Sequence, residues 1–139
     1  AEENTRESIY SALRRKEAFA TSGPRIKVRF FAGYDFDNEM INSKELVKHL
    51  YEKGHSMGSD ILNTSKKSEP EFFLWAIQDA DSAPLQRLQI IKGFVKDGEL
   101  KEIVFDVACS DDLQVNEGNY RCPDNGAEVS ERFGAWKGN

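Results

Sequence analysis

The segment Gly54-His55-Ser56-Met57-Gly58 matches a known catalytic motif letter for letter. Gly-x-Ser-x-Gly is the nucleophile elbow of lipases and esterases, in which a strand enters a strained turn and a helix leaves it, exposing the serine hydroxyl. The histidine base of that fold follows the serine in the chain. Here both histidines, His49 and His55, precede Ser56, and a predicted helix leads into the motif. We therefore predict a glycine-ended helix followed by a loop, and keep a small esterase using Ser56 as an alternative.

Metal chemistry is restricted by the ligands that the sequence offers. Zinc and iron sites need several converging His or carboxylate groups, and the two histidines lie six residues apart. Hard oxygen ligands that suit Ca²⁺ are plentiful near the C-terminal end, although their spacing is not that of an EF-hand. The same residue types are ordinary in loops. We assign no catalytic residue and no other metal ligand, and the one candidate is a loop cation site at Asp111, Asp112 and Asp124. The wider set of oxygen ligands is Asp106, Asp111, Asp112, Asn116, Glu117, Asp124 and Asn125.

The two cysteines, Cys109 and Cys122, allow one disulfide. It would close a loop of about a dozen residues and contribute about 3 kcal/mol to stability. In the alternative, Cys109 is a buried thiol on the inward face of a strand. The residues themselves leave both alternatives open, and with them the redox compartment.

Length and composition predict one soluble globular domain, since the chain has 139 residues, of which 39% are hydrophobic and 31% charged. A chain of this length can bury a core without staples. No apolar run approaches the roughly 20 residues that span a bilayer. A net charge of −5 argues against nucleic acid as a partner, because that binding needs a concentrated basic face.

The N-terminal region predicts a helix and a short strand. Asn4 followed three residues later by Glu7 is a capping box, and apolar side chains then repeat at i, i+4. We predict an amphipathic helix over residues 5 to 16 and a short strand over residues 18 to 21, AFAT, which Ser-Gly-Pro ends.

The next segment, RIKVRF at residues 25 to 30, alternates strictly between apolar and basic side chains. This pattern predicts a strand with one wet face and one face toward the core. The predicted core side consists of Ile26, Val28 and Phe30, and the wet side of Arg25, Lys27 and Arg29.

A second capping box, Asn42 to Glu45, predicts a second helix that ends at Gly54. Small polar residues from 55 to 70 predict a loop, with a short strand at residues 60 to 63. The apolar face of the helix consists of Leu46, Val47, Leu50 and Tyr51.

Residues 72 to 109 contain three apolar runs, FFLWAI, LQRLQIIKGFV and IVFDVAC. They predict consecutive strands at the centre of a small sandwich. FFLWAI has no polar face, which predicts an interior strand with Trp75 in the core. Asp97-Gly98 predicts a tight hairpin turn between the second and third runs. The residues predicted to alternate inward along the third run are Ile103, Phe105, Val107 and Cys109.

The predicted fold is therefore α+β and mainly β, an antiparallel immunoglobulin-like β-sandwich with two peripheral helices. A long loop rich in Asp, Asn and Gly follows residue 110, and a weak segment ends at Trp136. Trp136 lies among polar residues, so its side chain is either exposed or covered by something outside this chain.

Five stretches that together span nearly all of the chain are ENTRESIYSALRRKEAFATSGPRIKVRFFAGYDF, MGSD, FFLWAIQDADSAPLQRLQIIKGFVKDGE, IVFDVACSD and RCPDNGA. Together they resemble a bacterial family catalogued only as domain of unknown function thirty-six-oh-four. The longer members of that family resemble, in their N-terminal part, metal-dependent hydrolases of the polymerase-and-histidinol-phosphatase (PHP) type, which use histidine and aspartate ligands.

The resemblance implies that the chain is the C-terminal portion of such a protein. Residues 1–23 would be the closing helix and strand of a barrel, and residues 24–139 an accessory β-domain. The metal ligands of these hydrolases have no matching positions here, so the resemblance implies no cofactor in this chain and a divalent metal in the full-length protein. The expected partner is the N-terminal barrel of the same polypeptide, with no nucleic acid and no membrane span.

The implied function is a non-catalytic accessory or structural role, and the alternative is a free-standing ligand- or carbohydrate-binding module. Relatives continue through a further strand, which makes Asn139 an expected cut end and leaves Phe133 and Trp136 without their natural cover. The resemblance also favours a periplasmic or secreted protein over a cytoplasmic one. In an exported protein, Cys109 and Cys122 are expected to pair. Substrate and oligomeric state stay unassigned.

Overall fold

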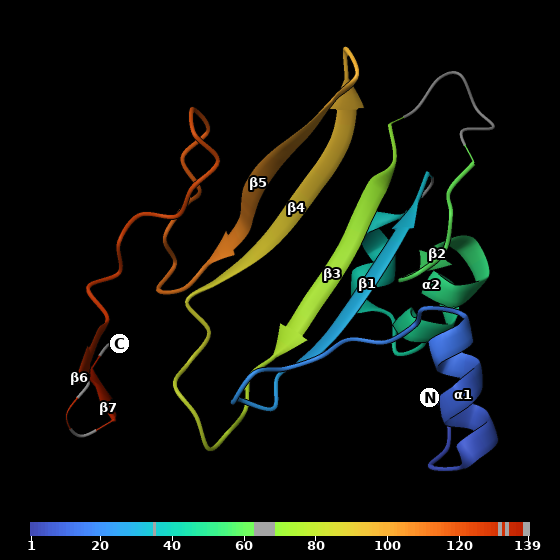
Figure 1. Ribbon diagram of the computed structural model, residues 1–139, viewed down its shortest axis with the longest axis horizontal. Helices are drawn as coiled ribbons and strands as arrows, with labels where there is room; N and C mark the ends of the chain where they lie inside the picture. The colour runs from blue at the N-terminus through green and yellow to red at the C-terminus, as the bar shows by residue number, and fades with distance from the viewer. Residues whose placement is uncertain (35, 63–68, 131, 133, 138–139) are drawn as a thin grey trace. The chain divides into compact units, whose positions relative to one another are not determined.

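A computed structural model describes residues 1–34, 36–62, 69–130, 132 and 134–137. The chain divides into two compact units, Ala1–Ile77 and Gln78–Asn139, each described by itself below. Two α-helices accompany seven strands, and every strand pair in the described residues is antiparallel (Figure 1). The prediction of an α+β, mainly β fold with antiparallel sheets is therefore confirmed.

The first unit begins with helix α1, Arg6–Arg14. Its N-cap is Thr5, whose hydroxyl accepts a hydrogen bond from the Ser8 backbone N–H at 3.2 Å, so the cap lies one residue after the predicted Asn4. The predicted strand over residues 18 to 21 is wrong, because these residues pair with no strand in the described chain. An extended segment becomes a strand only where a neighbour completes its backbone hydrogen bonds.

The sheet of the first unit has the order β2-β1-β3. β1, Lys27–Gly33, lies in the middle, between β2, His55–Ser56, and β3, Glu71–Ile77 (Figure 1). The FFLWAI run therefore occupies an edge of this sheet, and its predicted interior position is wrong. Phe72 and Ile77, near its two ends, are 49% and 56% exposed. An apolar run reports which residues avoid water, but not how many neighbouring strands it has.

The apolar core lies on one face of this sheet. Phe31 pairs directly with Phe73, and Arg29 with Trp75, so these four side chains share a face. Helix α2, Leu46–Lys53, and the 3-10 helix η1, Asn38–Asn42, supply the apolar residues that pack against it. The buried residues of this cluster are Phe31, Met40 and Leu50, with Phe36, Leu46, Phe73 and Trp75 packed against them.

The predicted wet side of this segment is exposed at Arg25, Lys27 and Arg29, but the predicted core side is corrected, because the core cluster lies on the Phe31 face. Val28 and Phe30 lie on the face of β1 opposite the core cluster and are half-buried. Phe31 lies on the same face as Lys27 and Arg29 and is 2% exposed. This face of β1 changes from charged at Lys27 and Arg29 to apolar at Phe31, because only the C-terminal part of the strand contacts the core cluster. A ring stack between Phe30 and Phe72, with centroids 5.7 Å apart, lies on the other face.

Helix α2 forms without the predicted capping box. Its N-cap, Glu45, has no side-chain cap bond, and Asn42 instead belongs to η1. The helix ends at Gly54 as predicted, where a Cβ atom would lie 2.8 Å from the Phe36 ring. Residues 60 to 62 form no strand, which corrects that prediction, and Asn63 lies outside the described residues.

The second unit is built on a long hairpin of β4, Arg87–Lys96, and β5, Glu99–Cys109. Asp97 and Gly98 have φ values of 54° and 79°, the positive values that a type I′ turn requires, and the predicted hairpin is confirmed. A small hairpin of β6, Glu128–Ser130, and β7, Ala135–Lys137, follows a long loop. Phe133 and the side chain of Trp136 lie outside the part of the chain that the structure describes.

A bulge changes the inward pattern of β5. Leu88 pairs with Ala108 but Gln89 with Asp106, so Val107 is an extra residue in the ladder. Ile103 and Val107 are 39% and 41% exposed, whereas Asp106 is 3% exposed. The predicted inward alternation is therefore wrong for these two residues, and a carboxylate occupies the buried position of the strand.

No helix among the described residues is long and apolar enough to cross a membrane.

Candidate functional site

The Gly-x-Ser-x-Gly motif does not form a nucleophile elbow. Helix α2 precedes the motif, and Ser56 lies in the two-residue strand β2, where it pairs antiparallel with Phe31. The elbow has the reverse order, a strand before the serine and a helix after it, on a parallel sheet. His55 pairs with Ala32 and so points to the opposite side of the strand from Ser56. The motif therefore lacks the local geometry of a serine hydrolase.

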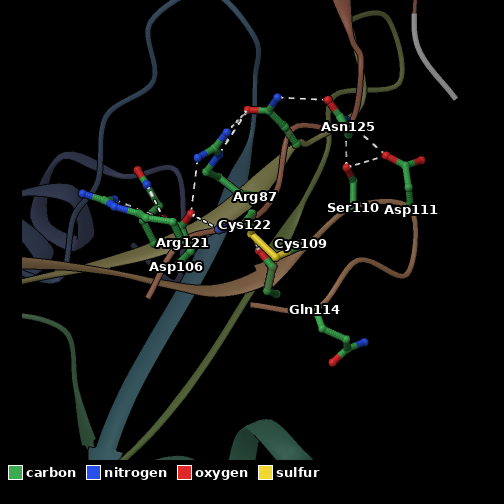
Figure 2. Close-up of a disulfide and its surroundings, with 12 residues drawn as sticks. Arg87, Asp106, Cys109, Ser110, Asp111, Gln114, Arg121, Cys122 and Asn125 are labelled. Atoms are coloured by element: carbon green, nitrogen blue, oxygen red, sulfur yellow. Dashed lines mark hydrogen bonds and ion pairs between the residues drawn. A yellow bond between two sulfur atoms is a disulfide. The ribbon is translucent and has the colours of Figure 1, made fainter. Parts of the chain in front are cut away.

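The structure joins Cys109 and Cys122 in a disulfide with a Cα–Cα distance of 5.7 Å (Figure 2). Cys109 is the last residue of β5, and Cys122 lies thirteen residues further along the chain. The bond therefore ties the Asp- and Asn-rich loop back to the strand from which it leaves. The residues by themselves leave this pair open between a disulfide and a buried thiol, and the family resemblance implies the disulfide.

Beside the disulfide, the Asp106 carboxylate on β5 is enclosed by donors from two other segments, β4 and the loop around Cys122 (Figure 2). Its Oδ2 atom accepts from the Cys122 backbone N–H at 2.7 Å and from Arg87 Nη1 at 3.3 Å. Its Oδ1 atom accepts from Gln89 Nε2 at 2.6 Å and from Arg121 Nη1 at 3.4 Å. The carboxylate is fully enclosed, with no side-chain exposure. It fastens β4, β5 and the loop to one another.

These donors hold the pKa of Asp106 below its usual range. The backbone N–H of Cys122 is the largest cause, followed by the Gln89 amide, while burial acts in the opposite direction and Arg121 and Arg87 add to the lowering. A carboxylate that accepts several hydrogen bonds is stabilised in its charged form. Asp106 is therefore an ionised structural anchor. The one hint in the sequence was a lone Asp within the apolar run IVFDVAC.

The three carboxylates of the predicted cation site lie in different local surroundings. Asp111 Oδ2 accepts from Ser110 Oγ at 2.7 Å and from Asn125 Nδ2 at 3.1 Å (Figure 2). Asp124 Oδ1 accepts from the Gly126 backbone N–H at 2.9 Å, and Asp112 has φ 55°. In the described ranges, no group of three or more His, Cys, Asp or Glu side chains could hold a metal ion. The loop thus does not gather Asp111, Asp112 and Asp124 as one ligand set.

The first unit carries a half-open groove of about 640 Å³. Its floor is the Arg29 face of β1 and β3, where the Arg29 guanidinium lies 5.8 Å from the centre of the Trp75 ring. The wall is the side of α2 that carries Tyr51. The Tyr51 ring meets the Phe31 ring edge-on, with the ring centroids 5.0 Å apart. Trp75, predicted as core, is half-buried and lines this groove.

A polar network crosses the groove from the end of α1. The Tyr51 hydroxyl donates a hydrogen bond to the Glu17 carboxylate, which also pairs with Arg15 Nη2 at 3.3 Å. Burial raises the pKa of Tyr51, the hydrogen bond and charge of Glu17 raise it further, and Arg29 opposes them. The hydroxyl is therefore neutral at physiological pH. Gly58 lies close against this end of α1, where a Cβ atom would be 2.5 Å from the Arg15 carbonyl oxygen.

Sequence reasoning did not find this groove. Its residues come from segments far apart in the chain, and each has an ordinary local explanation as a basic strand face, a helix face or a core aromatic. Only the pairing of β1 with β3 and the packing of α2 bring them together.

Comparison with known proteins places the chain in a family. Its whole length, residues 1–139, matches the family model described as "Protein of unknown function (DUF3604)". No curated protein and no solved structure matches the chain. Because the match covers every residue, the chain belongs to the DUF3604 family.

Proposed function

We propose that this chain is a non-catalytic accessory segment of a larger DUF3604 protein, a metal-dependent hydrolase of the PHP type. In this proposal the missing barrel of the same polypeptide carries the metal and the chemistry. The β-rich part of the chain forms an immunoglobulin-like sandwich in that assembly. The proposal is supported by the family match and by the apolar surface described next.

The observation that carries the proposal is the exposed apolar side of α1. Ile9, Tyr10 and Leu13 are 44%, 62% and 60% exposed, although Ala12 on the same helix is buried. A short surface helix is held in place mainly by the packing of its apolar face. This helix therefore presents apolar area that another surface can cover, as expected of a helix that closes a neighbouring barrel.

The hairpin of the second unit also exposes apolar side chains. Ile91, Val95 and Leu100 are 62%, 71% and 80% exposed. Exposed apolar patches of this kind mark surfaces that contact other proteins or ligands. Both units therefore support a role in which the chain packs against a larger body.

The test compares residues 1–139 with the longer natural polypeptide that contains them. We expect α1 amide hydrogens to exchange fast in the isolated chain and to be protected in the longer protein, because the added surface covers Ile9 and Leu13. As a control, amides of β5 should exchange at the same rate in both. Equal exchange of α1 in the two proteins would contradict the accessory role.

Activity gives a second readout for the same proposal. The longer protein should hydrolyse phosphoester or phosphodiester substrates only with manganese or zinc present, and residues 1–139 should be inactive with either metal. Turnover of nitrophenyl acetate by residues 1–139 that Ser56→Ala abolishes would instead establish the esterase alternative.

One observation favours the remaining alternative, a ligand- or carbohydrate-binding module. The groove of the first unit combines an indole ring with uncompensated basic side chains. Such a module would keep its ligand affinity as residues 1–139 and would show no dependence on a barrel.

A further inference from the structure

The groove of the first unit has an excess of positive charge at a defined place. Lys27 and Arg29 are two residues apart on β1 and lie on the same face of the sheet. The Lys27 side chain forms no hydrogen bond or ion pair within the described residues. Arg29 lies over the Trp75 ring, and the nearby Glu17 carboxylate is already occupied by Arg15 and Tyr51. Two cations on the floor of the groove are thus left without a carboxylate partner.

The same surface is apolar beside these cations. Ile77 pairs with Lys27 and Trp75 with Arg29 across the two strands, so each cation has an apolar neighbour. Ile77 is 56% exposed and Trp75 is half-buried. Indole and aliphatic surfaces of this kind pack against the C–H face of a sugar ring. The nearby Tyr51 hydroxyl donates its proton to Glu17 and can accept a hydrogen bond from a ligand hydroxyl.

The charge of the ligand is restricted by α1. The residues that follow its C-terminal end, Arg15 and Glu17, line the groove. A helix C-terminus carries partial negative charge, which disfavours a phosphate dianion more strongly than a carboxylate, because the dianion carries twice the charge. A guanidinium binds a carboxylate well because their geometries match. The groove volume of about 640 Å³ lies within the usual range of small-molecule sites.

We propose that this groove binds a sugar that carries a carboxylate, a uronic acid residue of an acidic saccharide. The carboxylate lies between Lys27 and Arg29, and the ring packs along Trp75 and Ile77. This site does not depend on the accessory role proposed above, because all of its residues belong to the first unit.

The test uses the full chain of residues 1–139 and digalacturonate as the probe. Calorimetry and tryptophan fluorescence should both report binding, and affinity should fall as salt is added, since exposed charge pairs are screened. The dimethyl ester of the same disaccharide keeps the rings and removes the charge, so it should bind more weakly. Equal affinity for acid and ester would overturn the carboxylate assignment.

Two substitutions separate this site from general surface charge. Lys27→Gln should weaken binding of digalacturonate about three- to five-fold, the range expected for one exposed charge pair. Lys44→Gln, an exposed lysine outside the groove, should leave affinity unchanged. Trp75→Phe should weaken acid and ester alike, because it reduces ring contact without changing charge. Equal effects of Lys27→Gln and Lys44→Gln, or no binding at millimolar probe, would refute the proposal.

Discussion

The two units of this chain are stabilised in different ways. In Ala1–Ile77 a β-sheet and a helix bury an apolar cluster around Phe31 and Leu50. In the described part of Gln78–Asn139, Asp106 is the one buried residue, and it lies beside the Cys109–Cys122 disulfide (Figure 2). The first unit therefore relies on packing, and the second relies on a hydrogen-bonded carboxylate and a covalent bond.

The difference follows from what each unit can bury. A two-stranded hairpin such as β4 with β5 has no layer of its own to cover its apolar side chains, and hairpins of this kind are marginal in water. A disulfide and a saturated carboxylate supply constraints that a small core cannot. The first unit has helix α2 to cover its sheet, and it needs no such link.

The largest expected effect is in the first unit. Phe31→Ala should lower the free energy of unfolding by about 3–5 kcal/mol, as for large core aromatics, because it removes the 2%-exposed ring at the centre of the cluster. Urea denaturation measures this loss. The matched change in the second unit, Ile91→Ala at a 62%-exposed position, should cost less than about 0.5 kcal/mol. Similar losses in both would remove the contrast between the units.

The next effect concerns the disulfide. Replacing Cys109 and Cys122 together by serine should cost about 3 kcal/mol, the value for a loop of this length. Hydrogen exchange should locate the loss in β5 and the following loop, while amides of α2 keep their protection. The intact mass of oxidised protein should be two hydrogens below that of the reduced protein. Two titratable thiols in protein prepared under oxidising conditions would show that the bond does not form.

A smaller effect is expected from Asp106, and it depends on pH. The folded-state pKa of Asp106 is lowered, so its stabilisation is complete above the unfolded pKa of about 3.9. It is lost as the pH falls through the folded pKa. Arg87 and Arg121 keep access to water, with side chains 30% and 43% exposed. We therefore expect a smaller loss than from breaking the disulfide.

Asp106→Asn is the variant that tests this prediction. Urea denaturation at neutral pH and at a series of acidic pH values should show a smaller acid-induced loss of stability in the variant than in the unmodified chain. Asp124→Asn, at an exposed loop position, serves as the control and should keep the full pH dependence. An unchanged acid dependence in Asp106→Asn would assign the effect to other carboxylates.

Local features were predictable from the order of residues. The turn at Asp97-Gly98 and both helices appear where turn chemistry and apolar spacing place them. The caps were less accurate, since Thr5 caps α1 and no side chain caps α2. Several nearby Asn, Ser, Thr and Glu side chains can compete for the same backbone N–H groups, so a capping box identifies a helix start only to within a few residues.

Residues close in the chain set turns and periodicity, so the order of residues was enough to locate most strands and both helices. Strand pairing and helix packing, which join distant residues, make β3 an edge strand, cover the Phe31 face of β1 and bury Asp106. Alternation distinguishes the two faces of a strand but not which face meets a helix. A buried carboxylate is stable only with donors around it, and those of Asp106 come from β4 and from the loop sixteen residues onward.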